Sequence, residues 1–325
     1  MNAQSDDIIR PLIEGVRKGQ PRALARTITL IENIAPGTEK LLAELHPLTG
    51  KAQRVGITGP PGAGKSTLVC ALVEAYRARE KTVGVIAVDP SSPLTGGALL
   101  GDRVRMESFT LDPGVFIRSM ATRGAVGGLA ITTQEASDVL DAFGFDVVIV
   151  ETVGVGQSEL DVAGSGDTTV LVLVPESGDE VQVLKAGIME IADIFVVNKS
   201  DRPDARLLVT ELVENLKLRS DREGDERERW TKPVISTVAT TGDGVTQLVE
   251  TLEKRREYLE RTGEGDRRRR DRLVRHARDV TDRLMRQRLW RNGAAEQILE
   301  RNVDEMASGR LSAYEVARMI LGISK

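Results

Sequence analysis

The sequence has few of the features that mark secreted or membrane proteins. Its single cysteine, Cys70, cannot form an internal disulfide and suits a reducing compartment. The first residues do not combine a basic segment with an apolar core, as a signal peptide does. No apolar run approaches the roughly 20 residues that a membrane-spanning helix needs. We therefore expect a cytoplasmic protein that does not enter a membrane.

Aromatic residues and excess positive charge are also scarce, which argues against nucleic acid as a partner. Aromatic residues make up 3% of the chain and the net charge is −4, so few side chains are available to stack on bases or attract phosphate backbones. Delivery of nickel or cobalt is disfavoured as well. It needs clusters of cysteine and histidine, but this chain has only Cys70, His46 and His276.

The middle of the chain alternates helical segments with nearly continuous runs of valine, isoleucine and leucine. Such runs are typical of strands buried on both faces of a parallel sheet. The sequence thus predicts an α/β protein with a mostly parallel sheet in a domain at 46–250. Apolar residues at helical spacing predict a helical region at 1–45 and a helical segment at 251–325. The expected strands are 54–58, 82–88, 115–118, 146–151, 168–174, 193–198 and 233–237.

Two charged stretches and one amphipathic helix stand out in the second half. The run at 219–231 predicts a solvated surface element. The run of arginines at 267–270 lies on a helix whose arginines are interleaved with aspartates at 266, 271, 279 and 282, which favours a charged helix face over an anion-binding site. Ser312 and Glu315 form the pattern of a capping box. An apolar stripe on the arginine-rich helix consists of Leu273, Val280, Leu284 and Leu289.

Residues 59–67, GPPGAGKST, match the phosphate-binding P-loop pattern G-x-x-x-x-G-K-[ST]. An apolar run of strand type precedes them and a helix-forming segment follows, as this loop requires. Its glycines let successive backbone N–H groups turn toward phosphates at a helix N-terminus. We expect the side chain of Lys65 to reach the β- and γ-phosphates. The predicted phosphate-binding residues are Gly59, Pro61, Gly62, Ala63, Gly64, Lys65, Ser66 and Thr67.

Residues 198–201, NKSD, match the N-K-x-D element that recognises guanine. The carboxylate of Asp201 would accept from the N1–H and N2–H groups of guanine, and Lys199 would pack along the base. Adenine lacks those donors, so a buried carboxylate facing it would lose affinity. Asn198 belongs to the same element. After the next strand, Ser236, Thr237 and Val238 occupy the place of a loop that binds guanine O6, although they depart from its common sequence.

Several oxygen-bearing side chains near the expected strand ends are candidate magnesium ligands. Magnesium prefers hard oxygen ligands and keeps several waters, so Ser66 with one or two carboxylates would suffice. The acidic candidates are Asp89, Asp102 and Glu151.

Glu151 and Gly154 match the D/E-x-x-G element that senses the γ-phosphate. The residue after Gly154 is Val155, and Gln157 comes two positions later, so the water-orienting glutamine of small GTPases is missing from its usual place. We therefore expect slow hydrolysis by the chain alone, which something else must complete. Lys65 and Glu151 are the catalytic candidates in this part of the chain.

Taken together, these stretches resemble the MeaB/ArgK family of GTPase chaperones associated with methylmalonyl-CoA mutase. The resemblance covers nearly the whole chain, and its most specific parts are ETVGVGQSE at 151–159 and PESGDEVQ followed by KAG between 175 and 187. The other parts lie at 23–26, 59–67, 89–92 and 198–201.

The resemblance implies a homodimeric P-loop GTPase with a C-terminal dimerisation arm at 251–325. It implies docking on an adenosylcobalamin-dependent mutase, methylmalonyl-CoA mutase or an isobutyryl-CoA-type relative, where GTP binding and hydrolysis gate cofactor loading and protect or rescue the mutase. The chain itself would bind no cobalamin. The family's magnesium ligands correspond to Ser66, Asp89, Asp102 and Glu151. Its third switch corresponds to 175–190, with Lys185 as the residue that couples partner contact to catalysis.

Two other functions share many of these motifs. An ATP-dependent kinase of amino-acid transport would prefer ATP, and the element at 198–201 argues against it. A nucleotide-gated scaffold with incidental hydrolysis would carry every motif named here, so the sequence leaves it open.

Overall fold

A computed structural model of the chain describes residues 3–89, 109, 111–121, 128–152, 166–175, 188–220, 229–290 and 293–322. The chain divides into two compact units, residues 1–272 and residues 273–325. The domain boundaries expected from the sequence, after residues 45 and 250, stay predictions. None of the described helices is both long enough and apolar enough to span a membrane.

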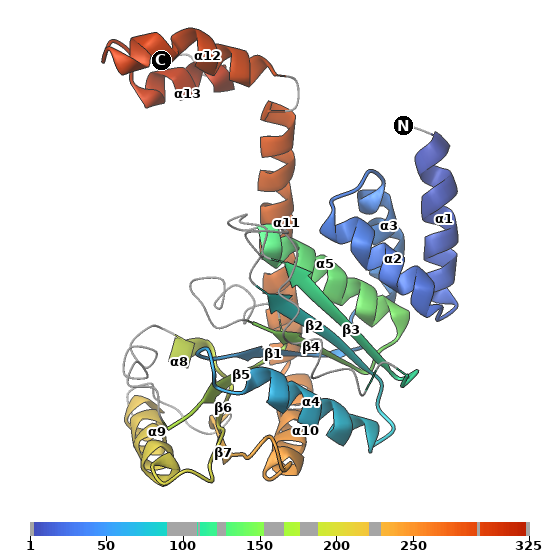
Figure 1. Cartoon of the computed structure of the whole chain (residues 1–325), viewed down its shortest axis with the longest axis vertical. Coiled ribbons are helices and arrows are strands. Elements are labelled where there is room, and N and C mark those ends of the chain that lie inside the picture. The colour runs from blue at the N-terminus through green and yellow to red at the C-terminus, as the bar shows by residue number, and fades with distance from the viewer. Residues whose placement is uncertain are drawn as a thin grey trace. The chain divides into compact units, whose positions relative to one another are not determined.

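The described residues of the first unit form a seven-stranded sheet in which all strand pairs are parallel (Figure 1). The strand order is β3-β2-β4-β1-β5-β6-β7. All seven predicted strands are therefore confirmed, with ends that differ by a few residues at most. The strands are β1 (Gln53–Thr58), β2 (Val83–Asp89), β3 (Val115–Ala121), β4 (Val147–Glu151), β5 (Thr168–Leu173), β6 (Ile194–Val197) and β7 (Val234–Ser236).

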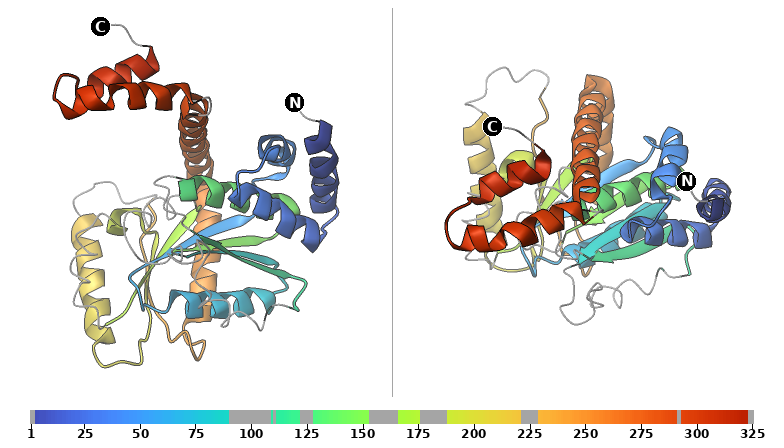
Figure 2. Two further views of the ribbon diagram at one scale, coloured as in Figure 1. Left: turned by 45° about the horizontal axis from the view of Figure 1, so that its top comes forward. Right: turned by 90° about the horizontal axis from the view of Figure 1, so that it is seen from above.

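Helices cover both faces of this sheet, as the continuous apolar strands require (Figure 2). Every residue of β1, β4, β5 and β6 is buried. One face packs on α4 (Lys65–Arg77) and α10 (Val245–Thr262). Two further helices, α8 (Ile188–Ile191) and α9 (Ala205–Ser220), pack against β5 and β6. The other face packs on α5 (Gly128–Phe143), with α1 (Ala3–Arg17), α2 (Pro21–Glu32) and α3 (Thr38–Leu45) in the same apolar cluster; a short 3₁₀ turn, His46–Leu48, follows α3.

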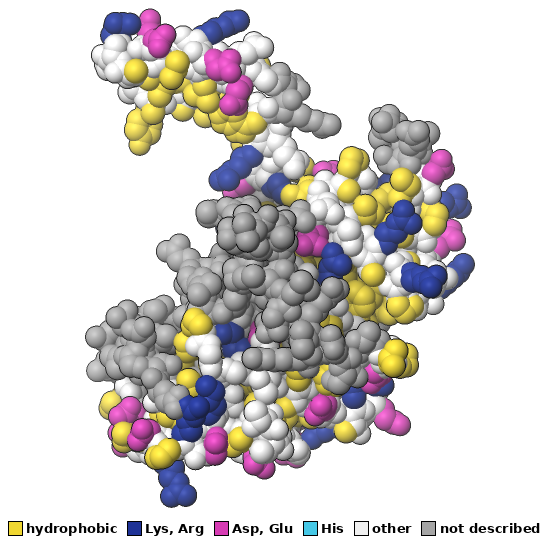
Figure 3. Space-filling view, in the orientation of Figure 1, with side chains coloured by type: hydrophobic (Ala, Val, Ile, Leu, Met, Phe, Trp, Pro, Cys, Tyr) yellow, Lys and Arg dark blue, Asp and Glu magenta, His cyan; other side chains and the backbone are white. Residues whose placement is uncertain are grey.

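The C-terminal segment is helical, as predicted. α11 (Glu264–Trp290) begins in the first unit, and α12 (Ala294–Ala307) and α13 (Ala313–Leu321) belong to the second. The capping box at Ser312 and Glu315 is confirmed, because the serine hydroxyl accepts from the Glu315 N–H and the glutamate accepts from the Ser312 N–H. Hydrophobic side chains gather along one side of α12 and α13 (Figure 3). Leu273 and Leu284 of the predicted stripe are exposed.

Candidate nucleotide site

Described residues at the carboxyl ends of four strands lie at one edge of the sheet. The strands are β1, β4, β6 and β7, and the carboxyl ends of parallel strands lie at the same edge. β1 is at the centre, with β4 on one side and β5 on the other, so the chain order reverses there. Open parallel sheets bind ligands at such a switch point. The motifs found in the sequence therefore share the edge where a ligand is expected.

The backbone after β1 takes a shape that only glycine tolerates at two positions. Gly59 has φ +144°, and a Cβ atom there would lie 2.1 Å from the carbonyl oxygen of Val172. Gly64 has φ +82° and caps the N-terminus of α4, which begins at Lys65. The first N–H groups of a helix lack partners within it, so they are available to an anion. The loop thus presents backbone donors where a phosphate would bind.

The side chain of Lys65 lies over this loop and is buried. Its Nζ donates to the carbonyl oxygens of Gly59, at 2.8 Å, and Pro60, at 3.0 Å. The ammonium group is therefore held within the loop before any phosphate is bound. A phosphate oxygen placed there would gain a charge-assisted hydrogen bond, which is stronger than a neutral one.

Ser66 and Glu151 are brought together, whereas two other predicted residues lie beyond what the structure describes. The Ser66 hydroxyl donates to Glu151 Oε1 at 2.6 Å. Asp89 ends β2, which pairs with β4, so its backbone lies at the same edge. Asp102 and Lys185 fall outside the described residues. Among the described residues, no three Asp, Glu, His or Cys side chains cluster closely enough to bind one metal ion.

Asn198 joins the phosphate loop to the segment after β7. Its Nδ2 donates to the carbonyl oxygen of Ala63 at 2.9 Å. Its Oδ1 accepts from the Thr237 hydroxyl and from the Ala239 N–H, both at 3.1 Å. The side chain is 2% exposed, so this amide is a buried link between two loops. The amide nitrogen contacts one loop and the amide oxygen contacts the other, so the Asn198 side chain holds the two loops together.

The rest of the predicted base-binding set surrounds this link. Lys199 has φ +56°, a left-handed conformation that turns the chain sharply after β6. The Ser200 N–H donates to the Thr237 carbonyl at 3.0 Å, and Asp201 is exposed. Ser236 ends β7 and is exposed, whereas Val238 is half-buried.

Sequence reasoning missed three contributors to this edge. Pro60 and Ala239 act through their backbone groups, which leave no signature in the sequence. Thr152 was missed as well: its hydroxyl donates to that of Thr58 at 3.2 Å and ties the end of β4 to the end of β1. Its position directly after the predicted ligand Glu151 was the available signal.

Replacing Gly64 with alanine is expected to weaken GDP binding by about tenfold or more, because the new methyl group would displace the Asn198 amide that it meets at 2.4 Å. Gly62→Ala is the matched control. It also has a positive φ, +77°, but no atom lies within 4 Å of its added Cβ. Isothermal titration with GDP measures both. An equal loss of GDP affinity in the two variants would show that backbone strain accounts for the effect and that the contact with Asn198 does not.

The sequence profile of one family, described as methylmalonyl-CoA mutase-associated GTPase MeaB, matches residues 24–294. A putative GTPase of Pyrococcus abyssi is 48% identical over 97% of this chain and 96% of its own length. A probable GTPase of Mycobacterium tuberculosis is 40% identical over 99% of this chain and 97% of its own. The mouse mitochondrial protein named methylmalonic aciduria type A homolog is 38% identical over 78% of this chain and 64% of its own.

One solved structure is similar over nearly the full length. The crystal structure of an LAO/AO transport system kinase aligns with a TM-score of 0.69 at 26% identity, covering 99% of this chain and 98% of that one. The parallel sheet with its flanking helices is therefore shared with a solved protein of similar length.

Proposed function

This chain belongs to the MeaB family of methylmalonyl-CoA mutase-associated GTPases, and we propose that it is a GTP-hydrolysing chaperone of an adenosylcobalamin-dependent acyl-CoA mutase. Methylmalonyl-CoA mutase is the first candidate partner. In this proposal, GTP binding and hydrolysis gate cofactor loading and protect or reactivate the mutase. The observation that carries the nucleotide part is the Asn198 link, which joins the phosphate loop to the proposed base-binding segments.

We propose that Lys65 and the N-terminus of α4 bind the phosphates. The ammonium group of Lys65 exchanges the carbonyl oxygens of Gly59 and Pro60 for phosphate oxygens when GTP binds. It then stabilises the negative charge that develops on the transferred phosphoryl group. Asp201 accepts from the guanine N1–H and N2–H groups, and Lys199 packs along the base. Ser236, Thr237 and Val238 flank the base on its O6 side.

Magnesium fits the donor set at this edge, because the Ser66 hydroxyl and the Glu151 carboxylate are hard oxygen donors in direct contact. We propose Ser66, Asp89, Asp102 and Glu151 as the residues that hold it. When bound, the ion neutralises charge on the β- and γ-phosphates. The Ser66 hydroxyl, which donates to Glu151, would then turn a lone pair toward the metal.

We further propose that the mutase completes the catalytic site. Val155 stands where small GTPases have their glutamine, so the chain alone lacks a water-orienting side chain at that position. Lys185 is the cation that partner contact would bring to the phosphates. This role rests on the family resemblance, because Lys185 lies outside the described residues.

The exposed apolar side chains of residues 273–322 support the proposal that this unit makes a homodimer. Val274, Met285, Val303 and Met319 are all exposed. Apolar side chains also gather along one side of α12 and α13 (Figure 3), and exposed apolar patches are typical of protein–protein contacts. Sedimentation equilibrium of the full chain measures this, and a strict monomer at micromolar concentration would refute it.

Hydrolysis of GTP is expected to rise by about tenfold or more when a purified adenosylcobalamin-dependent mutase from the same source is added. ATP in place of GTP is the control. Phosphate release is measured for each nucleotide with and without the mutase. If GTP binds but the mutase does not stimulate its hydrolysis, partner contact is not coupled to catalysis, and a nucleotide-gated scaffold is favoured. Equal turnover of ATP would contradict the guanine assignment and favour a kinase.

A further inference from the structure

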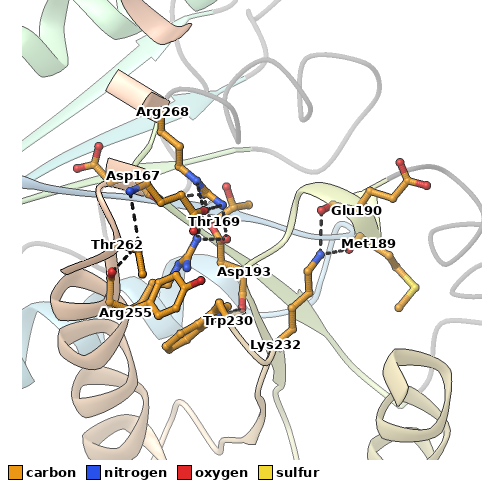
Figure 4. Close-up of polar contacts among 12 residues, drawn as sticks. Asp167, Thr169, Met189, Glu190, Asp193, Trp230, Lys232, Arg255, Thr262 and Arg268 are labelled. Carbon is orange, nitrogen blue, oxygen red and sulfur yellow. Dashed lines mark hydrogen bonds and ion pairs between the residues drawn. The ribbon is translucent and has the colours of Figure 1, made fainter. Parts of the chain in front are cut away.

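Asp193 lies directly before β6, at the opposite end of that strand from Asn198. Figure 4 shows Asp193 with its polar contacts. The residue is 3% exposed. Its carboxylate accepts two hydrogen bonds from Arg268, both at 2.8 Å, and one from Arg255 at 2.9 Å. A fourth comes from the Thr169 N–H at 2.9 Å. This is a buried charge whose lone pairs are satisfied by two arginines and the backbone of the neighbouring strand.

The main chain at the start of β6 is held as firmly as the Asp193 side chain. The Asp193 N–H donates to the Thr169 carbonyl, and the Asp193 carbonyl accepts from the Trp230 indole, both at 2.9 Å. The carbonyls of Met189 and Glu190, a few residues before Asp193, accept from the Lys232 ammonium (Figure 4). The chain that enters β6 is therefore fixed by side chains from several separate segments.

The two arginines come from either side of the junction between α10 and α11. Arg255 is 1% exposed, and its guanidinium lies 5.0 Å from the ring centres of both Trp230 and Tyr258. Glu264 Oε1 accepts from both arginines. Burial opposes ionisation of Glu264, but the bond from Arg255 and the two positive charges outweigh it and lower its pKa. The junction is thus a charge-balanced cluster with Asp193 at its centre.

The short, fully paired strand β6 connects this cluster to the base-binding element. β6 has four residues, paired to β5 on one side and to β7 on the other. At the rise of a β-strand, Asp193 and Asn198 are about 16 Å apart. A shift of Asp193 along the strand axis would be carried by β6 to Asn198 and to the turn that holds Asp201. We propose that Asp193 is a positioning residue for guanine recognition, set by the α10–α11 junction; this rests on the proposed guanine site.

The test is the ratio of the affinities for GDP and IDP, because IDP lacks the exocyclic N2 group that Asp201 would bind. A structural defect elsewhere weakens both nucleotides together and leaves this ratio unchanged. In Asp193→Asn the ratio is expected to fall by about fivefold, which is within the range for substitutions along a packed network that links two sites. Arg268→Lys keeps the charge but loses the bidentate contact, so a smaller fall in the same direction is expected even if Asp193→Asn does not fold.

Two further variants make the outcome decisive. Asp201→Asn is the positive control and should lose most of the discrimination. Asp141→Asn is the matched control. Its carboxylate is also buried and bound by an arginine, Arg54, but Asp141 belongs to α5 and contacts the backbone just before β1, so its replacement should leave the ratio intact. If the wild-type chain does not distinguish GDP from IDP, the guanine assignment fails. If it does, but the folded variants at Asp193 and Arg268 keep the wild-type ratio, the positioning role is overturned.

Discussion

Replacing Lys65 with alanine is expected to lower the rate of GTP hydrolysis by about 10²–10³-fold, the usual loss when one donor to a developing negative charge is removed. The ammonium group is buried over the phosphate loop and already oriented by the carbonyls of Gly59 and Pro60. When GTP binds, the ammonium group exchanges these carbonyls for phosphate oxygens, and the charge that develops in the transition state strengthens that interaction. Single-turnover hydrolysis with saturating enzyme measures this step apart from GTP affinity.

The matched control for Lys65→Ala is Lys51→Ala, which removes an exposed ammonium group just before β1. The control should hydrolyse GTP at the wild-type rate. Lys65→Ala should also remain folded, because Pro61 and Gly62 in the same loop are exposed and water can replace the lost donor there. A Lys65→Ala variant that is folded, binds GTP and turns over near the wild-type rate would contradict the proposed phosphate chemistry.

The sheet could be predicted from the sequence because its strands are continuous apolar runs. In β4, for example, Val147 to Val150 are all buried, and a short β-branched run of this kind between helical segments is typical of a strand covered on both faces. The parallel arrangement followed from the same pattern. The strand order could not be read in this way, because apolar runs of similar composition do not specify their neighbours.

The buried charges were not predictable from the sequence. Arg255 reads as one more charged residue on an amphipathic helix, yet it is among the most buried side chains described. Its partner Asp193 is 62 positions away, and Arg54 and Asp141 are 87 positions apart. No local pattern links such pairs. A weak signal existed: Asp146, Asp167 and Asp193 each stand directly before a buried strand.

The motifs located a candidate site in the sequence but did not show what each residue contacts. Asn198 was expected to belong to the base-binding element, and the structure shows its amide fully engaged with Ala63, Thr237 and Ala239. Ser66 and Glu151 were expected to share a metal, and they contact each other directly. A motif records which residue type is needed, whereas the partner depends on how loops from different strands meet.

Asp141→Asn is expected to destabilise the folded chain by about 1–3 kcal/mol, because buried N–H donors lose a charged acceptor and Arg54 keeps only one of its two carboxylate partners, Asp138. The Asp141 carboxylate accepts from the N–H groups of Gly50, Lys51 and Ala52 and from the guanidinium of Arg54, which is itself buried. An asparagine amide keeps one oxygen but turns an N–H₂ group toward these donors. Urea unfolding at neutral pH measures the difference.

The loss caused by Asp141→Asn should depend on pH in a defined direction. Burial raises the cost of ionising Asp141, but the Arg54 contact and the backbone N–H groups outweigh it, so its pKa is lowered in the folded chain. A lowered carboxyl pKa gives stability that is complete above the unfolded value, about 4, and that is lost as pH falls through the folded value. The difference between wild type and variant should therefore shrink below about pH 4.

Asp112→Asn is the control for both measurements of Asp141→Asn. Asp112 also pairs with an arginine, Arg77, but that pair is partly exposed at the surface, where solvent screens it. Its replacement should have only a small effect on unfolding. If Asp141→Asn lowers the free energy of unfolding no more than Asp112→Asn does, the contacts of Asp141 with Arg54 and the backbone before β1 do not stabilise the fold. If the difference in unfolding free energy between wild type and Asp141→Asn stays constant down to acid pH, the stabilisation comes from packing and not from the ionised carboxylate.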